Sequence, residues 1–341
     1  MSVQLRFVHT ADLHLDSPFH CLQGSGGEIG ALLREATFET FERILSLCRR
    51  RQADFLLIAG DVFDAADRSL RAQLRFRDGL AGLAADGIQS FVVHGNHDPL
   101  DGWSATLDWP KGVHIFRDTA GPRAVAVRKG GIEVARIHGI SYPHRDVRAN
   151  LALQFRRGGD SFNIGLLHCN VGENTGHEPY APCSLEELTA AGMDYWALGH
   201  VHARAVLSPR APAVVYPGNP QGRNGMETGP RGCYLVEVDP NHQVRLEFAA
   251  VEAVRWEQAA IDAAALSSEQ ELLDGINKVI REQRRACDRP TVLRLRLEGR
   301  SALHAALQRG QVLEDLLAEA RSIGSSDEPL IWIERIEDHT L

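Results

Sequence analysis

The chain has 341 residues, of which 44% are hydrophobic and 24% charged, and its formal net charge is −8 at pH 7. This length suits one large domain or two ordinary ones, and the composition excludes a disordered chain. The N-terminus lacks the features of a signal peptide, and no run approaches the ~20 apolar residues that span a bilayer. We therefore expect a cytoplasmic protein that does not act at a membrane.

Arginine supplies nearly all of the positive charge, since Lys111, Lys129 and Lys278 are the only lysines. A guanidinium binds phosphate through two parallel hydrogen bonds, but a genome rich in G and C produces the same bias. Charge alone therefore leaves nucleic-acid binding open. The six cysteines show no zinc-type spacing, and we expect them to be reduced and buried.

Apolar runs alternate with amphipathic stretches over most of the chain, a rhythm that predicts parallel strands joined by helices. The expected strands are Val3–His9, Asp54–Ala59, Ile88–Val93, Val113–Phe116, Arg123–Arg128, Ile132–His138, Phe162–His168, Tyr195–Leu198, Ala213–Tyr216, Cys233–Asp239 and Val244–Ala250. The expected helices are Glu28–Arg51, Arg68–Asp86, Asp146–Arg157 and Ser184–Ala191, the last with a capping box of Ser184 and Glu187. Gly24–Gly27 reads as a loop.

The pattern changes around Trp256–Ser268. Beyond it we expect the helix Ser268–Cys287, the strand Pro290–Leu297, the helix Ser301–Ser322 and the strand Leu330–Ile336. None of these elements ends in residues that bind metals. The sequence therefore predicts two domains, residues 1–256 and a small α/β domain of residues 257–341.

Polar side chains follow five of the apolar runs, at the point where each run ends. They are Asp12 with His14, Asp61 with Asp64 after Gly60, Asn96 with His97 and Asp98 after Gly95, His168 alone, and His200 with His202 after Gly199. Each motif alone is more often an ordinary polar loop than a functional site. Because parallel strands end on one rim, the five together predict a dense cluster of oxygen and imidazole ligands.

These five motifs, in this order, resemble the calcineurin-like metallophosphoesterase superfamily over about residues 1–255. The segments Ala11–Phe19 and Tyr216–Arg223 resemble the SbcD-type DNA repair exonucleases, in particular their YhaO-like branch, and the C-terminal segment is similar to the capping domain of those nucleases. The resemblance implies a layered α/β metallophosphoesterase sandwich with a small C-terminal α/β capping domain.

The resemblance also implies the metal ligands. Asp12, His14, Asp61 and His202 would hold one ion, and Asp61 would bridge to a second ion held by Asn96, His168 and His200. A bridging carboxylate allows the separation of about 3.5–4 Å at which two ions grip one phosphoryl group. Oxygen and imidazole ligands without thiolate suit Mn²⁺, with Fe²⁺ and Zn²⁺ as alternatives.

Two aspartates and two divalent ions leave the loaded site with a charge of about +2, so it attracts phosphate although the chain is acidic. A water shared by two metals is acidic enough to attack phosphorus as hydroxide near neutral pH. The resemblance implies that His97 stabilises or protonates the departing oxygen and that Asp64 orients His97. Some nucleases of the family have a histidine where Asp64 stands. We expect Asp98 to cap the turn that follows it, and His9, His94, His138 and His177 to be structural or solvated.

The favoured function is a Mn²⁺-dependent DNA exo/endonuclease of DNA repair, with arginines such as Arg223 positioning the DNA backbone. One alternative is a phosphodiesterase or phosphatase acting on small nucleotides. Another is a non-catalytic subunit that binds DNA ends for an ATPase complex.

The chain contains no phosphate-binding loop of an ATPase, and the resemblance implies a separate SbcC-like coiled-coil ABC ATPase as partner. In SbcD-like proteins this partner docks on helices beyond the capping domain. The sequence stops at Leu341, soon after the last expected strand, so we expect that docking element to be absent or trimmed away. The oligomeric state stays open, with a homodimer as one option.

Overall fold

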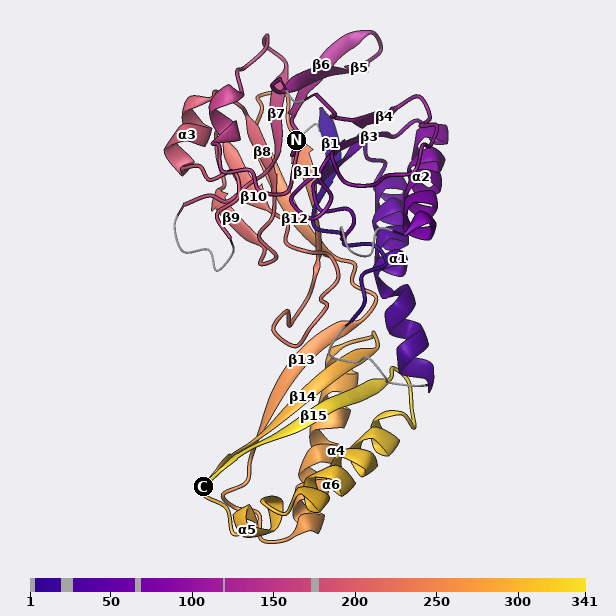
Figure 1. The fold of residues 1–341 in the computed structure, drawn as a ribbon, viewed down its shortest axis with the longest axis vertical. Helices are drawn as coiled ribbons and strands as arrows, with labels where there is room; N and C mark the ends of the chain where they lie inside the picture. The colour runs from indigo at the N-terminus through magenta and orange to yellow at the C-terminus, as the bar shows by residue number, and fades with distance from the viewer. Residues whose placement is uncertain (1–3, 20–26, 65–68, 119, 173–177) are drawn as a thin grey trace. The chain divides into compact units, whose positions relative to one another are not determined.

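The computed structural model describes residues 4–19, 27–64, 69–118, 120–172 and 178–341 (Figure 1). Contacts divide the chain into two compact units. The first consists of Met1–Pro18, Thr37–Gln221 and Arg231–Val251, and the second of Phe19–Ala36, Gly222–Pro230 and Glu252–Leu341. The division into domains at residue 257 stays a prediction. His177, Cys21, most of the Gly24–Gly27 loop and the start of the expected helix Arg68–Asp86 lie outside the described residues.

Two six-stranded sheets form the first unit. In the first sheet the order is β12-β11-β1-β2-β3-β4, with bounds Val244–Ala250, Gly232–Val238, Leu5–Thr10, Phe55–Ala59, Gln89–Val93 and Val113–Ile115. In the second it is β5-β6-β7-β8-β10-β9, with bounds Arg123–Lys129, Ile132–Gly139, Phe162–His168, Tyr195–Gly199, Ala213–Tyr216 and Ala205–Ser208. Strands β1 to β4 are parallel, as are β6, β7, β8 and β10. The expected hairpin of β5 and β6 is confirmed.

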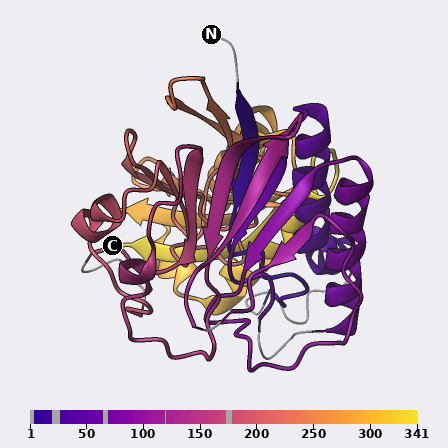
Figure 2. The same ribbon diagram turned by 90° about the horizontal axis from the view of Figure 1, so that it is seen from above.

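The sheets pack face to face, and each has a helical layer on its outer side. In β2, Phe55, Leu57 and Ala59 belong to the core between the sheets, whereas Leu56 and Ile58 pack beneath helices. Successive residues of a strand point to opposite faces, so a strand that is covered on both faces is apolar throughout. Helices α1 (Gly27–Arg50) and α2 (Leu70–Ala85) flank the first sheet, and both are drawn in indigo to purple along one side of Figure 2.

The outer face of the second sheet is covered by α3 (Leu185–Ala190) and by the short 3-10 helix η2 (Leu151–Gln154). The capping box of Ser184 and Glu187 is present at the start of α3. The expected helix Asp146–Arg157 is wrong, because only η2 forms there. The Arg156 guanidinium donates to the carbonyl groups of Leu153 and Phe155, both at 2.7 Å, which a continuing helix would have used itself.

The second unit contains a parallel three-stranded sheet of order β13-β14-β15. Its strands are Arg255–Asp262, Thr291–Gly299 and Ile331–Thr340, and its helices α4, α5 and α6 are Glu269–Ala286, His304–Leu307 and Gly310–Gly324. The single helix expected over Ser301–Ser322 is therefore two. Strand β13 was missed because only Trp256 and Ile261 in it are buried, which leaves a weak periodic signal.

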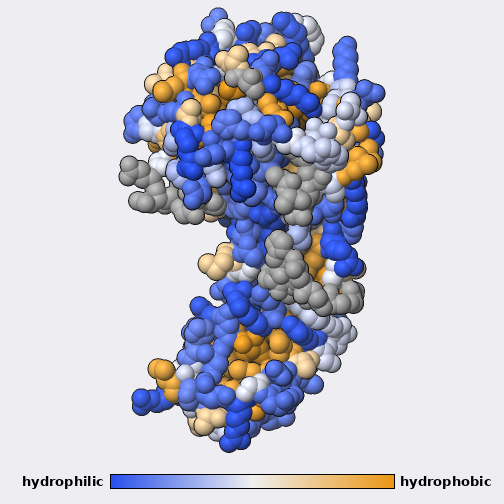
Figure 3. All heavy atoms as spheres, in the orientation of Figure 1, coloured by the Kyte–Doolittle hydropathy of each residue, from blue (hydrophilic) through white to orange (hydrophobic). Residues whose placement is uncertain are grey.

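The face of the chain visible in Figure 3 is mostly hydrophilic. Among the described residues, no helix is long and apolar enough to cross a membrane.

Candidate metal centre

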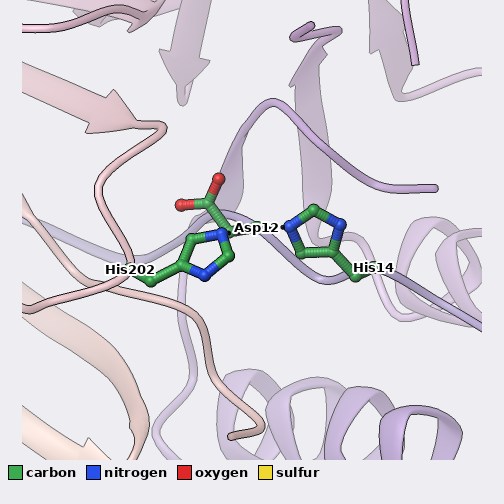
Figure 4. A group of neighbouring side chains, drawn as sticks. All are labelled: Asp12, His14 and His202. Atoms are coloured by element: carbon green, nitrogen blue, oxygen red, sulfur yellow. Dashed lines mark hydrogen bonds between the residues drawn. The ribbon is translucent and has the colours of Figure 1, made fainter. Parts of the chain in front are cut away.

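The loops after β1 and β8 bring Asp12, His14 and His202 together, with one ligand atom of each within 4.8 Å of the others (Figure 4). The Asp64 carboxylate can only accept, so His14 donates from Nδ1 to Asp64 Oδ1 at 2.9 Å. In a neutral imidazole this leaves the lone pair on His14 Nε2, which lies 3.2 Å from His202 Nε2. Two ring nitrogens at this distance need a proton or a cation between them.

A second group unites Asp12, Asp61 and His168, all of which are buried. His168 donates from Nδ1 to the carbonyl oxygen of Ala59 at 2.9 Å, which fixes its tautomer. Its Nε2 therefore faces Asn96 Oδ1 at 3.0 Å and Asp61 Oδ2 at 3.3 Å. The structure thus brings Asn96 and His168 to the same carboxylate, Asp61.

His200 connects the two groups. Its backbone N–H donates to both carboxylate oxygens of Asp12, at 3.1 and 3.2 Å, and its ring centroid lies 5.2 Å from that of His168. His200 also donates from Nε2 to the carbonyl oxygen of Glu178 at 2.9 Å, so Nδ1 is the nitrogen that can bind a metal. All seven residues proposed as ligands therefore belong to one network of contacts.

The backbone at this site is strained. Asp12, His14, Asp61 and His200 have φ values of 54°, 43°, 49° and 102°, a region that residues other than glycine rarely adopt. Such conformations are unfavourable by about 1–3 kcal/mol each and concentrate at functional sites. Four of the eight described residues of this kind that are not glycine are thus proposed ligands.

Three motif glycines make room for the network. A Cβ atom at Gly60 would lie 2.3 Å from His168 Nδ1, and one at Gly95 would lie 2.3 Å from Asp61 Oδ1. At Gly199 it would lie 1.9 Å from the carbonyl oxygen of Ala59, the acceptor of His168. These glycines are needed for close approach, in addition to any turn that they permit.

Burial and charge shift the pKa values of the metal-free centre. Burial raises the pKa of Asp12 to about 6, helped by the charge of Asp61 and opposed by His168 and His202. Burial also acts to raise the pKa of Asp61, but the imidazoles of His168, His97 and His14 hold it well below its usual range. For His168 burial is outweighed by the charges of Asp61 and Asp12, and its pKa rises to about 9. The buried carboxylates therefore retain a positive partner without a metal.

Asp64 and His97 are brought together as predicted. His97 Nδ1 lies 2.7 Å from Asp64 Oδ1, the same oxygen that accepts from His14. The backbone N–H of His97 donates to Asp61 Oδ1 at 2.9 Å. Side-chain exposure rises from 0% at His14 through 14% at Asp64 to 37% at His97, so His97 is the member of this trio most accessible to a substrate.

Asp98 does not have the capping role that the sequence indicated. Its buried carboxylate accepts from the backbone N–H groups of Val62 and Gly95 at 2.9 and 2.8 Å, and from His94 Nδ1 at 2.9 Å. It therefore links the loop that carries Asp61 to the loop that carries Asn96. No local pattern could reveal this, because Val62 is 36 residues away.

The other residues singled out from the sequence lie outside the network. His9 is a buried structural residue bonded to Tyr195 and Leu198, and His138 is bonded to Asn163. Arg223 belongs to the second unit, where its backbone N–H donates to Glu227 Oε2 at 2.7 Å.

The donor set consists of carboxylate, amide and imidazole groups, and none of the described cysteines belongs to it. Such donors fit divalent ions of the Mn²⁺, Fe²⁺ and Zn²⁺ series. The residues present therefore fit a pair of divalent cations.

Residues 5–204 match the family of calcineurin-like phosphoesterases, and residues 256–341 match the middle domain of the metallophosphoesterase YhaO. The chain belongs to the calcineurin-like phosphoesterase family, which implies phosphoesterase activity at a dinuclear metal site. It is 38% identical to the metallophosphoesterase YhaO of Bacillus subtilis over 341 residues, which are 100% of this chain and 83% of that protein.

Two further relatives are more distant. The DNA double-strand break repair protein Mre11 of Methanopyrus kandleri is 28% identical, over 79% of this chain and 61% of that protein. One of the subunits of the nuclease SbcCD of Bacillus subtilis is 24% identical, over 75% of this chain and 73% of that protein.

Proposed function

We propose that this chain is a metal-dependent DNA nuclease that hydrolyses phosphodiester bonds with two bound divalent ions, Mn²⁺ in the first place. The observation that carries the proposal is the single buried network of the seven candidate ligands, with the Asp64–His97 pair beside it. One ion would be held by Asp12, His14, Asp61 and His202, and the other by Asp61, Asn96, His168 and His200. Two such ions polarise the phosphoryl group and lower the pKa of a water molecule.

The remaining residues act on the leaving group. As water adds to phosphorus, the bond to the departing oxygen breaks and that oxygen takes a proton from His97. Asp64 accepts the Nδ1 hydrogen bond of His97 at 2.7 Å and so orients the ring. Proton transfer from a positioned side chain typically contributes about 10²–10⁴-fold to the rate.

DNA as the substrate is supported by the relatives named for DNA double-strand break repair and for nuclease activity. It also agrees with the cytoplasmic location that the sequence predicts. We assign the C-terminal segment, residues 257–341, as a capping domain, and Arg223 as a contact to the DNA backbone.

The test is hydrolysis by chelator-treated protein after addition of Mn²⁺, Fe²⁺ or Zn²⁺. We expect Mn²⁺-dependent release of nucleotides from linear DNA, and a loss of about 10²-fold or more for His97→Asn. Cyclic dinucleotides serve as the competing substrate. Intact DNA together with consumed cyclic dinucleotide would overturn the DNA assignment in favour of a small-nucleotide phosphodiesterase.

The relative that is named as part of the SbcCD nuclease supports a partner protein. We propose an SbcC-like coiled-coil ABC ATPase in this role. Copurification of that ATPase with the protein, and stimulation of DNA cleavage by ATP, would support it. Binding of DNA ends by wild-type protein that cleaves nothing with any of the three metals would favour the non-catalytic subunit instead.

A further inference from the structure

Ser17 lies in the segment Ala11–Phe19, next to the predicted metal ligands but without a role among them. Its side chain is buried, with 5% of the residue exposed, and its hydroxyl donates to Asp64 Oδ2. Its backbone N–H donates to the carbonyl oxygen of His14 at 3.2 Å. Ser17 thus contacts the carboxylate that His14 and His97 share.

The two oxygens of Asp64 have different partners. Oδ1 accepts from His14 Nδ1 at 2.9 Å and lies 2.7 Å from His97 Nδ1, while Oδ2 accepts from Ser17. The last torsion of an aspartate side chain is soft and roughly two-fold, so one hydrogen-bonded oxygen does not fix the carboxylate plane. A donor on each oxygen does fix it. Because Asp64 is partly exposed, water would replace Ser17 without the same constraint.

We propose that Ser17 is a positioning residue for the leaving-group histidine. Its hydroxyl holds the plane of Asp64 so that Oδ1 receives His97 Nδ1, and the ring of His97 is then aimed with Nε2 toward the departing oxygen. This inference rests on the proposed phosphodiesterase function. It gives Ser17 a task that acts through Asp64 and His97, without contact to the substrate.

The proton transfer that Ser17 supports is balanced. The phosphorus–oxygen bond breaks, its electron pair stays on the departing oxygen, and that oxygen takes the Nε2 proton of His97. His97 keeps its Nδ1 proton on Asp64 and regains the other from solvent, to which the attacking water has lost one. Only a poor leaving group, such as the alkoxide of DNA, depends on this transfer. A p-nitrophenolate leaves without it.

The test compares two phosphodiesters of thymidine, thymidine 5′-(p-nitrophenyl phosphate) and the dinucleotide TpT, with wild-type protein and Ser17→Ala. We expect Ser17→Ala to lower kcat on TpT by about tenfold to a hundredfold, part of the acid-catalysis contribution. On the p-nitrophenyl ester we expect less than a threefold change. An equal loss on both esters, or no loss on either, would overturn the proposal.

Ser69→Ala is the matched control. The Ser69 hydroxyl donates to Asp16 Oδ2 at 2.5 Å, one residue from Ser17 in the same loop, and also caps α2 by accepting from the N–H of Ala72. Its removal should lower the thermal stability and leave the ratio of the two rates unchanged. A changed ratio in Ser69→Ala would make the Ser17 effect a general result of loosening this loop.

A second measurement needs no activity. Imidazole ¹⁵N spectra of the metal-free protein report the tautomer of His97, whose signals are assigned by their loss in His97→Asn. Wild-type His97 should show a fixed Nδ1–H form, and Ser17→Ala should show an averaged one. Unchanged His97 signals together with an unchanged rate ratio overturn the role of Ser17 and leave the proposed function standing. If wild-type protein cleaves neither ester, the proposed function fails and the spectra alone decide whether Ser17 orients His97.

Discussion

His168 shows how closely single residues of the centre are fitted to one another. One of its nitrogens is fixed by the Ala59 carbonyl group, and the other faces Asn96 and Asp61. Gly60, Gly95 and Gly199 each leave space for this arrangement that a methyl group would fill. A small change at any of these glycines should therefore disturb metal binding more than stability.

Gly95→Ala tests this expectation. The new Cβ atom would lie 2.3 Å from Asp61 Oδ1 and 2.7 Å from His168 Nε2, so at least one of the two must move. We expect a loss of metal affinity of about 10–100-fold by isothermal titration calorimetry, the range that follows from displaced supporting groups. Gly310→Ala, whose Cβ atom would meet nothing within 4 Å, should bind metal as the wild type does. Equal affinities in the two variants would contradict the packing role of Gly95.

Proton release on metal binding is a second expectation at this scale. In the metal-free protein the pKa of His168 is raised to about 9, so the ring is protonated at pH 7 and must lose that proton to bind a cation. Affinity should rise with pH up to about 9, and fall further below about 6, where Asp12 is protonated as well. Calorimetry at pH 7 in buffers of different ionisation enthalpy should show release of roughly one proton per protein. Heats that do not depend on the buffer would contradict it.

At the scale of elements, the centre is assembled from strand ends. Strands β1, β2 and β3 of one sheet and β7 and β8 of the other end beside it, and short loops carry the functional side chains. The loops after β2 and β3 are tied together by Asp98, which accepts from Val62 and Gly95. The separation between Asp61 and Asn96 thus depends on one buried carboxylate.

Asp98→Asn should loosen this connection. The amide keeps one acceptor oxygen and presents an NH₂ group to a donor that previously had an acceptor, which is unfavourable by about 1–3 kcal/mol. We expect a lower melting temperature and weaker metal binding, since Asp61 and Asn96 no longer hold a fixed separation. Asp86→Asn is the control, because Asp86 pairs with Arg49 on the surface, at 2.6 Å and with 49% of its side chain exposed. A variant at Asp98 that binds metal with wild-type affinity would exclude the linking role.

For the whole molecule, the balance of charge at the centre matters more than the net charge of −8. Asp12 and Asp61 are buried charges that need positive partners, and only His168 carries the raised pKa that supplies one in the metal-free protein. Ions that bind the folded chain and not the unfolded one must therefore stabilise it.

Thermal unfolding with and without Mn²⁺ measures this effect. At a free concentration of about 100 times the dissociation constant, binding adds about 2.7 kcal/mol to the free energy of unfolding. For a unit of about 200 residues this raises Tm by about 5–10 °C. Asp61→Asn, which lacks the bridging carboxylate, should lose most of the increase. A Tm that is independent of the metal in the wild type would contradict a folded-state metal site.

The regular part of the fold follows from the sequence. Strands covered on both faces, such as Phe55–Ala59, are apolar throughout and easily recognised, and the capping box of Ser184 was found from its spacing. Elements with one weak face were not found. Residues 146–157 have apolar residues at helical spacing, yet Arg156 occupies the carbonyl groups that a helix would need.

The sequence by itself determined which residue types gather at the rim, because parallel strands end on one side and Asp12, Asp61, Asn96, His168 and His200 each follow such an end. Only the tertiary structure decided how these residues are held. The bonds of Asp98 to Val62 and of Ser17 to Asp64 join segments 36 and 47 residues apart, and the glycines act by leaving space beside distant side chains. Periodicity in a sequence reports local burial, whereas such contacts depend on the order in which strands lie side by side.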